Sequence, residues 1–112
     1  MVGNTIFKTI KKNKLFRVIS CNRKDLDLTN QKLVDKWFKK NEPEIVINAA
    51  GKVGGILDNA SYQSDYLYIN AMIGLNLINT SLKYEVKQFI NLGSACIYPK
   101  NVGQPIKEDS LL

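Results

Sequence analysis

Hydrophobic and polar positions follow several different periods along this chain. Over residues 3–12 the apolar residues Ile6, Phe7 and Ile10 recur at helical spacing with lysines between them, which predicts an amphipathic helix. Residues 15–20 form a short apolar run and predict a strand. The chain is therefore expected to begin with a helix that is followed by a strand.

The middle of the chain predicts a second helix and a buried strand. Thr29 is a good N-cap for a helix that runs to residue 40 and ends at Glu42-Pro43. The apolar face of this helix consists of Leu33, Val34, Trp37 and Phe38. Residues 45–50 form a β-branched run that is apolar on both faces, which is typical of a strand inside a parallel sheet.

A turn with three glycines, Gly51, Gly54 and Gly55, separates that strand from a long helix predicted over residues 62–83. The apolar positions of this helix are Tyr66, Ile69, Ile73 and Leu77. Residues 88–92 predict a further strand, and the tail after Pro99 is predicted to be a loop. The alternation of helices and strands predicts an α/β fold with a doubly wound parallel sheet.

One element of such a sheet has no counterpart in the sequence. In Rossmann-type sheets the first strand lies in the middle and leads through a glycine-rich turn into the first helix. Here Met1-Val2-Gly3 looks like the last part of that turn. We therefore interpret residues 1–112 as a partial Rossmann-type domain that lacks its first strand. We expect the isolated chain to be unstable, because a missing central strand leaves two sheet edges exposed.

Composition and charge narrow the class of protein. The 112 residues, 45% hydrophobic and 23% charged, suit one small folded domain, and no apolar run approaches the ~20 residues that span a bilayer. The net charge is +6, and no acidic residue precedes Asp25. A non-catalytic module that binds nucleic acid is one interpretation of this charge, and a general bias toward Lys, Asn and Ile is the other. No targeting segment is predicted.

Cysteine and histidine usage limits the chemistry. The two cysteines, Cys21 and Cys96, are far apart, and the chain has no histidine. A zinc site of the usual kinds is therefore not expected, and we assign no metal ligand. Sparse cysteine usage suits a reducing cytoplasm.

The segment after the last predicted strand carries the reactive side chains. Ligands of α/β sheets bind at the carboxyl ends of strands, where Ser94, Cys96 and Tyr98 follow one another. If the backbone stays extended, all three point to the same side. A hydroxyl and a thiol on one face could hold and deprotonate a substrate. The alternatives are that the serine belongs to a turn and that the cysteine is a small buried hydrophobe.

Three segments resemble a known enzyme family. Residues 93–99, Gly-Ser-Ala-Cys-Ile-Tyr-Pro, look like the signature segment of the GDP-L-fucose synthases, which are extended short-chain dehydrogenase/reductases. Residues 49–56, Ala-Ala-Gly-Lys-Val-Gly-Gly-Ile, resemble that family's Ala-Ala-x-Lys-Val-Gly-Gly-Ile stretch. Residues 1–3 match the end of its phosphate loop. The resemblance extends over essentially the whole chain.

The resemblance implies an activity and roles for two residues. These enzymes convert GDP-4-keto-6-deoxy-D-mannose to GDP-L-fucose, by epimerisation at C3 and C5 and then reduction of the 4-keto group by NADPH. The position of Ser94 implies a hydrogen bond to the 4-keto oxygen. The position of Cys96 implies that this cysteine works together with a histidine and is the base that removes a proton α to the ketone. A thiolate suits this role, because the carbonyl acidifies those C–H bonds.

The choice of cofactor has support from the residues as well. NAD-type sites usually carry an acid just after the second strand, whereas here Cys21-Asn22 is followed by Arg23 and Lys24, which favours the 2′-phosphate of NADP over NAD. Asp27 either borders the adenine, as the resemblance implies, or complements a helix N-terminus. The remaining cofactor positions implied by the resemblance are Met1, Val2, Gly3, Leu28, Ala49, Ala50, Gly51, Leu92, Gly93 and Ala95.

The chain also departs from the family. The family's Tyr-x-x-x-Lys pair and its catalytic histidine have no counterpart, and neither does its C-terminal substrate domain. We therefore expect a fragment of a cytoplasmic enzyme, homodimeric when intact, that acts on a GDP-sugar and binds neither nucleic acid nor membrane. Another sugar-nucleotide epimerase or dehydratase of the same superfamily is the alternative. Cys96 distinguishes the two, since those relatives generally carry Ser or Thr there.

Overall fold

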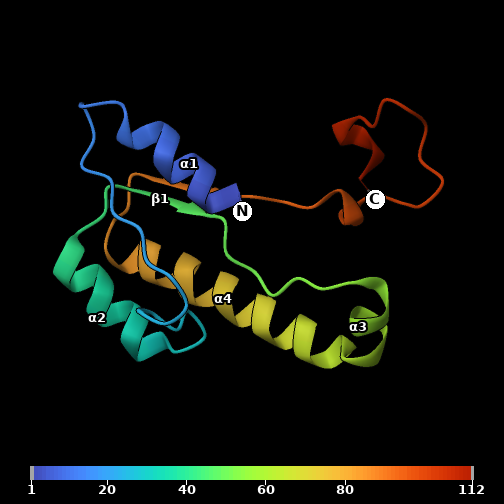
Figure 1. The fold of residues 1–112 in the computed structure, drawn as a ribbon, viewed down its shortest axis with the longest axis horizontal. Helices are drawn as coiled ribbons and strands as arrows, with labels where there is room; N and C mark the ends of the chain where they lie inside the picture. The colour runs from blue at the N-terminus through green and yellow to red at the C-terminus, as the bar shows by residue number, and fades with distance from the viewer. Residues whose placement is uncertain (1, 112) are drawn as a thin grey trace.

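The computed structural model describes residues 2–111, apart from the side chain of Ala95. In chain order the elements are α1 (Val2–Lys11), α2 (Gln31–Asn41), β1 (Ile45–Asn48), α3 (Ile56–Ser61), α4 (Gln63–Lys83), β2 (Gln88–Asn91) and two short 3-10 turns, η1 (Ala95–Ile97) and η2 (Glu108–Ser110). Figure 1 shows the strands between α1 on one side and α2 with α4 on the other. The three-layer α/β arrangement confirms the predicted fold class.

The sheet, within residues 2–111, consists of β1 and β2, which run parallel. Ile45 pairs with Gln88 at one end and Asn48 with Asn91 at the other, so the carboxyl ends of both strands meet at one edge. The strands predicted over residues 45–50 and 88–92 are thus confirmed with shorter bounds. The expected full burial of the first is wrong, because Ile45 is 44% exposed at the start of a sheet this narrow.

The strand predicted over residues 15–20 does not form. A strand is defined by its ladder of hydrogen bonds, and in the described part of the chain β1 pairs with β2 instead. Asn13 binds the amides that such a ladder would use. Its side chain accepts from the backbone N of Leu15 at 3.1 Å, and its carbonyl accepts from that of Phe16. Leu15 and Phe16 are consequently exposed.

The core lies between α2, α4 and the sheet. Its buried cluster consists of Val34, Phe38, Ile73 and Leu77. Each such side chain stabilises the fold by about 1.5–3 kcal/mol relative to leaving it in water. The prediction that Leu33 shares this face is wrong, because its side chain is 44% exposed and does not belong to the core cluster.

The N-cap of α2 is Asn30 rather than the predicted Thr29. The side-chain oxygen of Asn30 accepts from the backbone N of Lys32 at 3.1 Å and of Leu33 at 3.2 Å. The hydroxyl of Thr29 instead donates to the carboxylate of Asp27 at 2.7 Å. One residue therefore separates the predicted and observed starts of the helix. Its end is as predicted, with Glu42 as the C-cap.

Besides η1, the elements α3 and η2 were not predicted. The short helix α3 follows the glycine turn and carries Ile56 and Leu57 exposed, so no hydrophobic period marks it. The tail beyond Pro99 is mostly irregular, as predicted, but contains η2. Among the residues that the structure describes, none of the helices combines the length and the apolar character needed to cross a membrane.

Candidate functional site

A groove of about 220 Å³ lies where β1 ends. Its lining comes from the loop before α2, the residues after β1 and one side of α4: Cys21, Asn22, Arg23, Leu26, Asp27, Leu28, Thr29, Ala49, Ala50, Gly51, Lys52, Ile69 and Ile73. Six of the predicted cofactor residues are among them, namely Arg23, Asp27, Leu28, Ala49, Ala50 and Gly51. The fold thus brings together two segments that are more than twenty positions apart in the sequence.

A side-chain turn fixes the first wall of this groove. Oδ1 of Asn22 accepts from the backbone N of Lys24 at 2.8 Å and of Asp25 at 3.2 Å, as Asn does in tight turns. The turn leaves Arg23 in the lining of the groove and Lys24 outside it. Of the two cations predicted to face the 2′-phosphate, Arg23 therefore has access to a ligand in this groove and Lys24 does not.

Asp27 serves the local structure and also borders the groove. Its carboxylate accepts from the backbone N of Thr29 at 2.9 Å and from the hydroxyl of the same residue. The Thr29 hydroxyl is the main cause that lowers the pKa of Asp27 below its ordinary value. Asp27 therefore lies in the lining of the groove and binds the turn before α2, while Asn30 caps the helix. Its contact with an adenine stays a prediction.

The start of α1 approaches the end of β1. A Cβ placed on Gly3 would lie 3.3 Å from the Cβ of Ala49, so only a glycine fits there without a shift. Gly3 and Val2 form the first turn of α1 and do not line the groove itself. Met1, which was assigned to the phosphate loop together with Val2 and Gly3, lies outside the described residues.

The segment after β2 is not extended, which corrects the basis on which Ser94, Cys96 and Tyr98 were expected to share a face. The ladder continues to Leu92, whose N donates to the Asn48 carbonyl at 3.0 Å, and the chain then curls into η1. Positions two apart in a 3-10 helix are separated by about two thirds of a turn, so the period of two does not apply.

A local hydrogen bond explains this curl. Oγ of Ser94 accepts from the backbone N of Cys96 at 3.2 Å, which is the turn chemistry considered for this serine. Both residues are exposed beyond the carboxyl end of β2. Leu92 and Gly93 are exposed beside them and are not among the residues that line the groove, whereas the side chain of Ala95 lies outside the described part of the structure.

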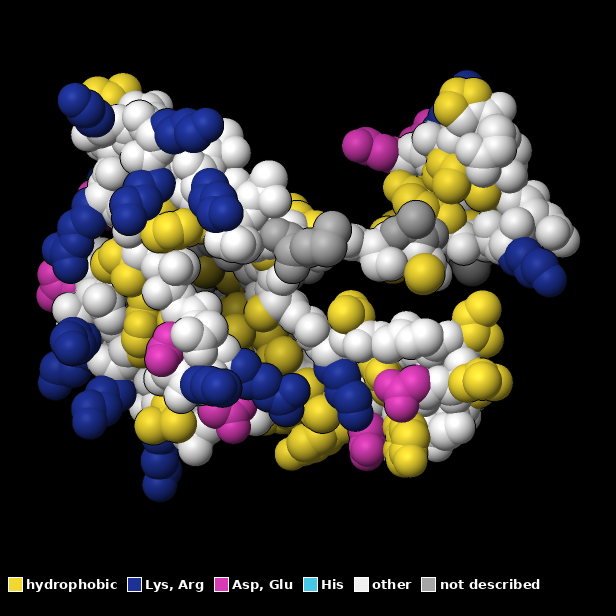
Figure 2. Space-filling model, in the orientation of Figure 1, with side chains coloured by type: hydrophobic (Ala, Val, Ile, Leu, Met, Phe, Trp, Pro, Cys, Tyr) yellow, Lys and Arg dark blue, Asp and Glu magenta, His cyan; other side chains and the backbone are white. Residues whose placement is uncertain are grey.

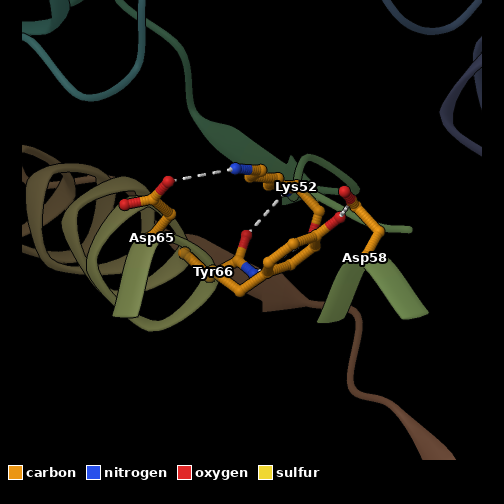
Figure 3. A network of polar contacts seen from close by, with 5 residues as sticks. Lys52, Asp58, Asp65 and Tyr66 are labelled. Atoms are coloured by element: carbon orange, nitrogen blue, oxygen red, sulfur yellow. Dashed lines mark hydrogen bonds and ion pairs between the residues drawn. The ribbon is translucent and has the colours of Figure 1, made fainter. Parts of the chain in front are cut away.

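Residues on α4 that sequence analysis did not assign to a site fix the loop after β1. Oδ1 of Asn70 accepts from the backbone N of Lys52 at 2.7 Å, and its Nδ2 donates to the Lys52 carbonyl at 3.0 Å. In Figure 3 the Lys52 side chain lies between Asp65 and Tyr66, with Nζ 3.9 Å from the carboxylate and 4.6 Å from the ring centre. The Tyr66 hydroxyl donates to Asp58 of α3, which raises the pKa of Tyr66.

Ile69, Ile73 and Cys21 also line the groove without having been predicted there. The two isoleucines were assigned to the core by their helical spacing. Nothing in the sequence distinguishes an isoleucine that packs in the core from one that also lines the groove. The thiol of Cys21 is partly desolvated in the groove, and this effect, with a smaller one from Asp25, raises the pKa of Cys21. At neutral pH the thiol is therefore protonated and a poor nucleophile.

Basic side chains are spread widely over the surface. On the face shown in Figure 2, lysines and arginines are scattered over the region of α1 and α2, with acidic and apolar side chains between them. Two ion pairs neutralise part of this charge: Lys83 binds Asp35, and Lys87 binds Glu44. Among the residues that the structure describes, the basic side chains on this face therefore form no continuous stripe of the kind that follows a nucleic-acid backbone.

The sequence model of the NAD dependent epimerase/dehydratase family matches residues 1–112. A GDP-L-fucose synthase of Sinorhizobium fredii (strain NBRC 101917 / NGR234) is 43% identical over the whole chain, which corresponds to 35% of that protein. GDP-L-fucose synthase 1 of Arabidopsis thaliana is 38% identical over the same share of each. The chain thus spans about a third of the length of the curated relatives it matches.

Solved structures share the fold. A GDP-mannoheptose C4 reductase from Campylobacter jejuni, solved with NADP bound, superimposes with a TM-score of 0.88 at 34% identity. The match covers 97% of this chain and 32% of the reductase. The helices and strands described above are therefore arranged as in about a third of that solved structure.

Proposed function

Because this chain belongs to the NAD dependent epimerase/dehydratase family, we propose that it forms part of the cofactor domain of an NADPH-dependent GDP-sugar epimerase-reductase. The reaction is the conversion of GDP-4-keto-6-deoxy-D-mannose to GDP-L-fucose. The observation that carries this proposal is the groove at the end of β1, which unites Arg23, Asp27 and Leu28 with Ala49, Ala50 and Gly51. Residues 1–112 then belong to an NAD(P)-binding Rossmann domain.

The lining of the groove fits one end of a dinucleotide. Drug-sized ligands occupy pockets of ~300–1,000 Å³, and the groove, with about 220 Å³, suits a part of the cofactor. Leu28, Ile69 and Ile73 offer apolar surface to a planar base, and the small residues after β1 let a ribose approach the backbone. We assign the adenosine end of the cofactor to this groove.

Arg23 favours the phosphorylated form of the cofactor. Arg23 is among the residues that line the groove, and the planar fork of donors on a guanidinium matches a phosphate better than a ribose hydroxyl. Asp27, an acid in the lining of the groove, already accepts two hydrogen bonds from Thr29 through Oδ1, which leaves it less capacity for the ribose hydroxyls that an NAD-type acid binds. NADP is therefore the cofactor we propose.

The substrate chemistry falls to the residues after β2. Bound NADPH supplies the hydride that reduces the 4-keto carbon. Ser94 donates a hydrogen bond to the keto oxygen, and the Cys96 thiolate takes a proton from C3 or C5, with the charge moving onto that oxygen. Both side chains are exposed at the carboxyl edge of the sheet. With no histidine among the 112 residues, the acid that returns the proton must come from elsewhere in the enzyme.

The cellular setting follows from the same proposal. The substrate and cofactor are soluble cytoplasmic metabolites, and the two free cysteines suit a reducing compartment. We propose a cytoplasmic enzyme, homodimeric when intact, that binds a GDP-sugar and neither nucleic acid nor membrane.

The test uses the intact polypeptide that carries this sequence, incubated in deuterated water with NADPH and GDP-4-keto-6-deoxy-D-mannose. We expect GDP-L-fucose with deuterium at C3 and C5. Cys96→Ala should abolish the wash-in, whereas Ser94→Ala should retain it and lose at least ~100-fold in the rate of NADPH oxidation, as for other groups that stabilise an oxyanion. Wash-in that is unaffected by the cysteine change would contradict the assignment.

A reductase without epimerase activity is the second candidate. Its support is the likeness to the C4 reductase, at 34% identity. It predicts NADPH oxidation by a 4-keto GDP-sugar with no deuterium at C3 or C5 in the unmodified protein. The same experiment therefore separates the two candidates.

A further inference from the structure

Asn76 is a buried polar residue on α4 that the fold does not require for its apolar contacts. It is 4% exposed, and its Nδ2 donates to the backbone carbonyl of Leu28 at 2.9 Å. A buried amide costs free energy unless it is hydrogen-bonded. Leucine, whose side chain has the same number and branching of heavy atoms, would carry no such cost. The side chain therefore serves the segment that it binds.

That segment is one wall of the groove, and α4 is the other. Leu28 and Asp27 line the first wall, while Ile69 and Ile73 line the second. Positions 69, 73 and 76 lie on one face of the helix, because they are separated by four and three residues. One helix thus supplies the second wall directly and ties down the first wall through Asn76.

The chemistry of the bond fixes its direction. A backbone carbonyl can only accept, so the amide nitrogen of Asn76 faces Leu28 and no apolar or acidic residue can replace it. One turn further along α4, Thr80 makes a similar buried contact, accepting from Nε2 of Gln31 at 2.9 Å. Gln31 belongs to α2 and does not line the groove, so Thr80 ties α4 to α2 and Asn76 ties α4 to the ligand site.

We propose that Asn76 is a positioning residue that sets the width of the groove for the adenosine end of the cofactor. This inference rests on the proposed function. The ligand it concerns is a purine nucleoside with a 2′-phosphate, placed between Leu28 and the isoleucines of α4. Loss of the bond frees the Leu28 carbonyl to turn toward water, and the wall moves with it.

The experiment compares Asn76→Leu with Thr80→Val in the intact polypeptide, by calorimetric titration with two halves of the cofactor. Asn76→Leu should raise the Kd for adenosine 2′,5′-bisphosphate and for NADPH about 10-fold, as for the loss of one buried hydrogen bond. The Kd for reduced nicotinamide mononucleotide and the kcat at saturating NADPH should not change. Thr80→Val should lower the thermal midpoint and leave all of these constants unchanged.

The inference about Asn76 would be overturned, and the proposed function left standing, by an unchanged Kd for adenosine 2′,5′-bisphosphate in Asn76→Leu. It would also be overturned if the Kd rose equally in both variants, or equally for both halves of the cofactor. If the unmodified protein binds neither adenosine 2′,5′-bisphosphate nor NADPH, the proposed function fails as well. Should Asn76→Leu not fold, the unmodified protein gives the same answer by NMR. Its Asn76 side-chain amide signals should shift with adenosine 2′,5′-bisphosphate and not with reduced nicotinamide mononucleotide, and the absence of that shift would overturn the inference.

Discussion

Asn48 of β1 and Asn91 of β2 are register partners whose side chains bind each other across the sheet. Nδ2 of Asn48 donates to Oδ1 of Asn91 at 2.7 Å, and Oδ1 of Asn48 accepts from the backbone N of Ala50 at 3.0 Å. One largely buried amide therefore connects the end of β2 to the residues that follow β1. These are the two places to which the proposed function assigns the substrate and the cofactor.

Asn48→Ala should lower the free energy of unfolding by about 1–3 kcal/mol, because a buried hydrogen-bonding side chain is lost and the amide of Ala50 is left without its partner. Chemical denaturation of Asn48→Ala, Asn91→Ala and the double variant forms a cycle that isolates the pair. We expect a coupling free energy of about 0.5–1.5 kcal/mol. Strict additivity would show that the two amides do not stabilise each other.

Gly54→Ala should destabilise the loop between β1 and α3. A Cβ at this position would clash with the Tyr66 hydroxyl and lie 2.6 Å from Oδ2 of Asp58, inside the network of Figure 3. Gly55→Ala is the matched control, since nothing lies within 4 Å of its added Cβ. We expect a loss of about 1–3 kcal/mol for the first variant only, measured by thermal unfolding. Equal losses would mean that backbone freedom, and not the clash, requires these glycines.

Arg23→Ser should weaken NADPH binding without affecting NADH. A charged hydrogen bond contributes about 1.5–3 kcal/mol, which corresponds to a rise of roughly 10- to 150-fold in the Kd for NADPH. Lys24→Ser is the control, because this neighbouring cation lies outside the groove. Fluorescence titration of both variants with both cofactors gives the answer. Equal effects of the two substitutions would indicate long-range attraction and no direct contact.

The ion pair between Asp35 and Lys83 predicts a dependence of stability on acid. The hydrogen bond from Lys83 lowers the pKa of Asp35, so the pair stabilises the fold above the ordinary carboxyl pKa and loses this effect as the pH falls through the lowered value. The same bond raises the pKa of Lys83. On the alkaline side, the stabilisation by the ion pair therefore persists until strongly alkaline pH. The contribution is small at an exposed site.

The difference in stability between the unmodified protein and Asp35→Asn should therefore be constant from neutral pH down to about pH 5 and vanish near pH 2. Urea titrations across this range measure it. Asp109→Asn, in the tail, serves as the control, because none of the ion pairs found among residues 2–111 involves it. A difference that persists at pH 2 would point to packing and not to charge.

The sequence was most informative where local pattern and tertiary contact agree. The helical period of Ile69, Ile73 and Leu77 predicts α4, and these side chains do pack toward the core. Residues 15–20 carry an equally good strand pattern, but a strand needs a partner that no local pattern can supply. The short helix α3 forms without a hydrophobic period in its sequence, because its apolar residues are exposed, and it could therefore not be predicted from that period.

The candidate site was predictable in part for the same reason. Arg23 could be assigned because ligands of α/β sheets bind at strand ends, whatever the side-chain contacts are, and Ala49 because its segment resembles that of the family. The shape of the segment around Ser94 could not, since it depends on a single bond from the Cys96 amide to the serine oxygen. The roles of Asn70 and Asn76 were not predicted, because the partners of these polar helix residues, Lys52 and Leu28, are distant in the sequence.

The narrow contact between Gly3 and Ala49 has a consequence for how this sequence can vary. A Cβ on Gly3 would lie 3.3 Å from the Cβ of Ala49, closer than ordinary van der Waals contact, so a side chain added at position 3 requires a shift of a few tenths of an ångström. A smaller residue at position 49 would relieve that contact. Homologous chains that gain an atom at one position should compensate at the other, and paired substitutions at these two positions should succeed where single ones fail.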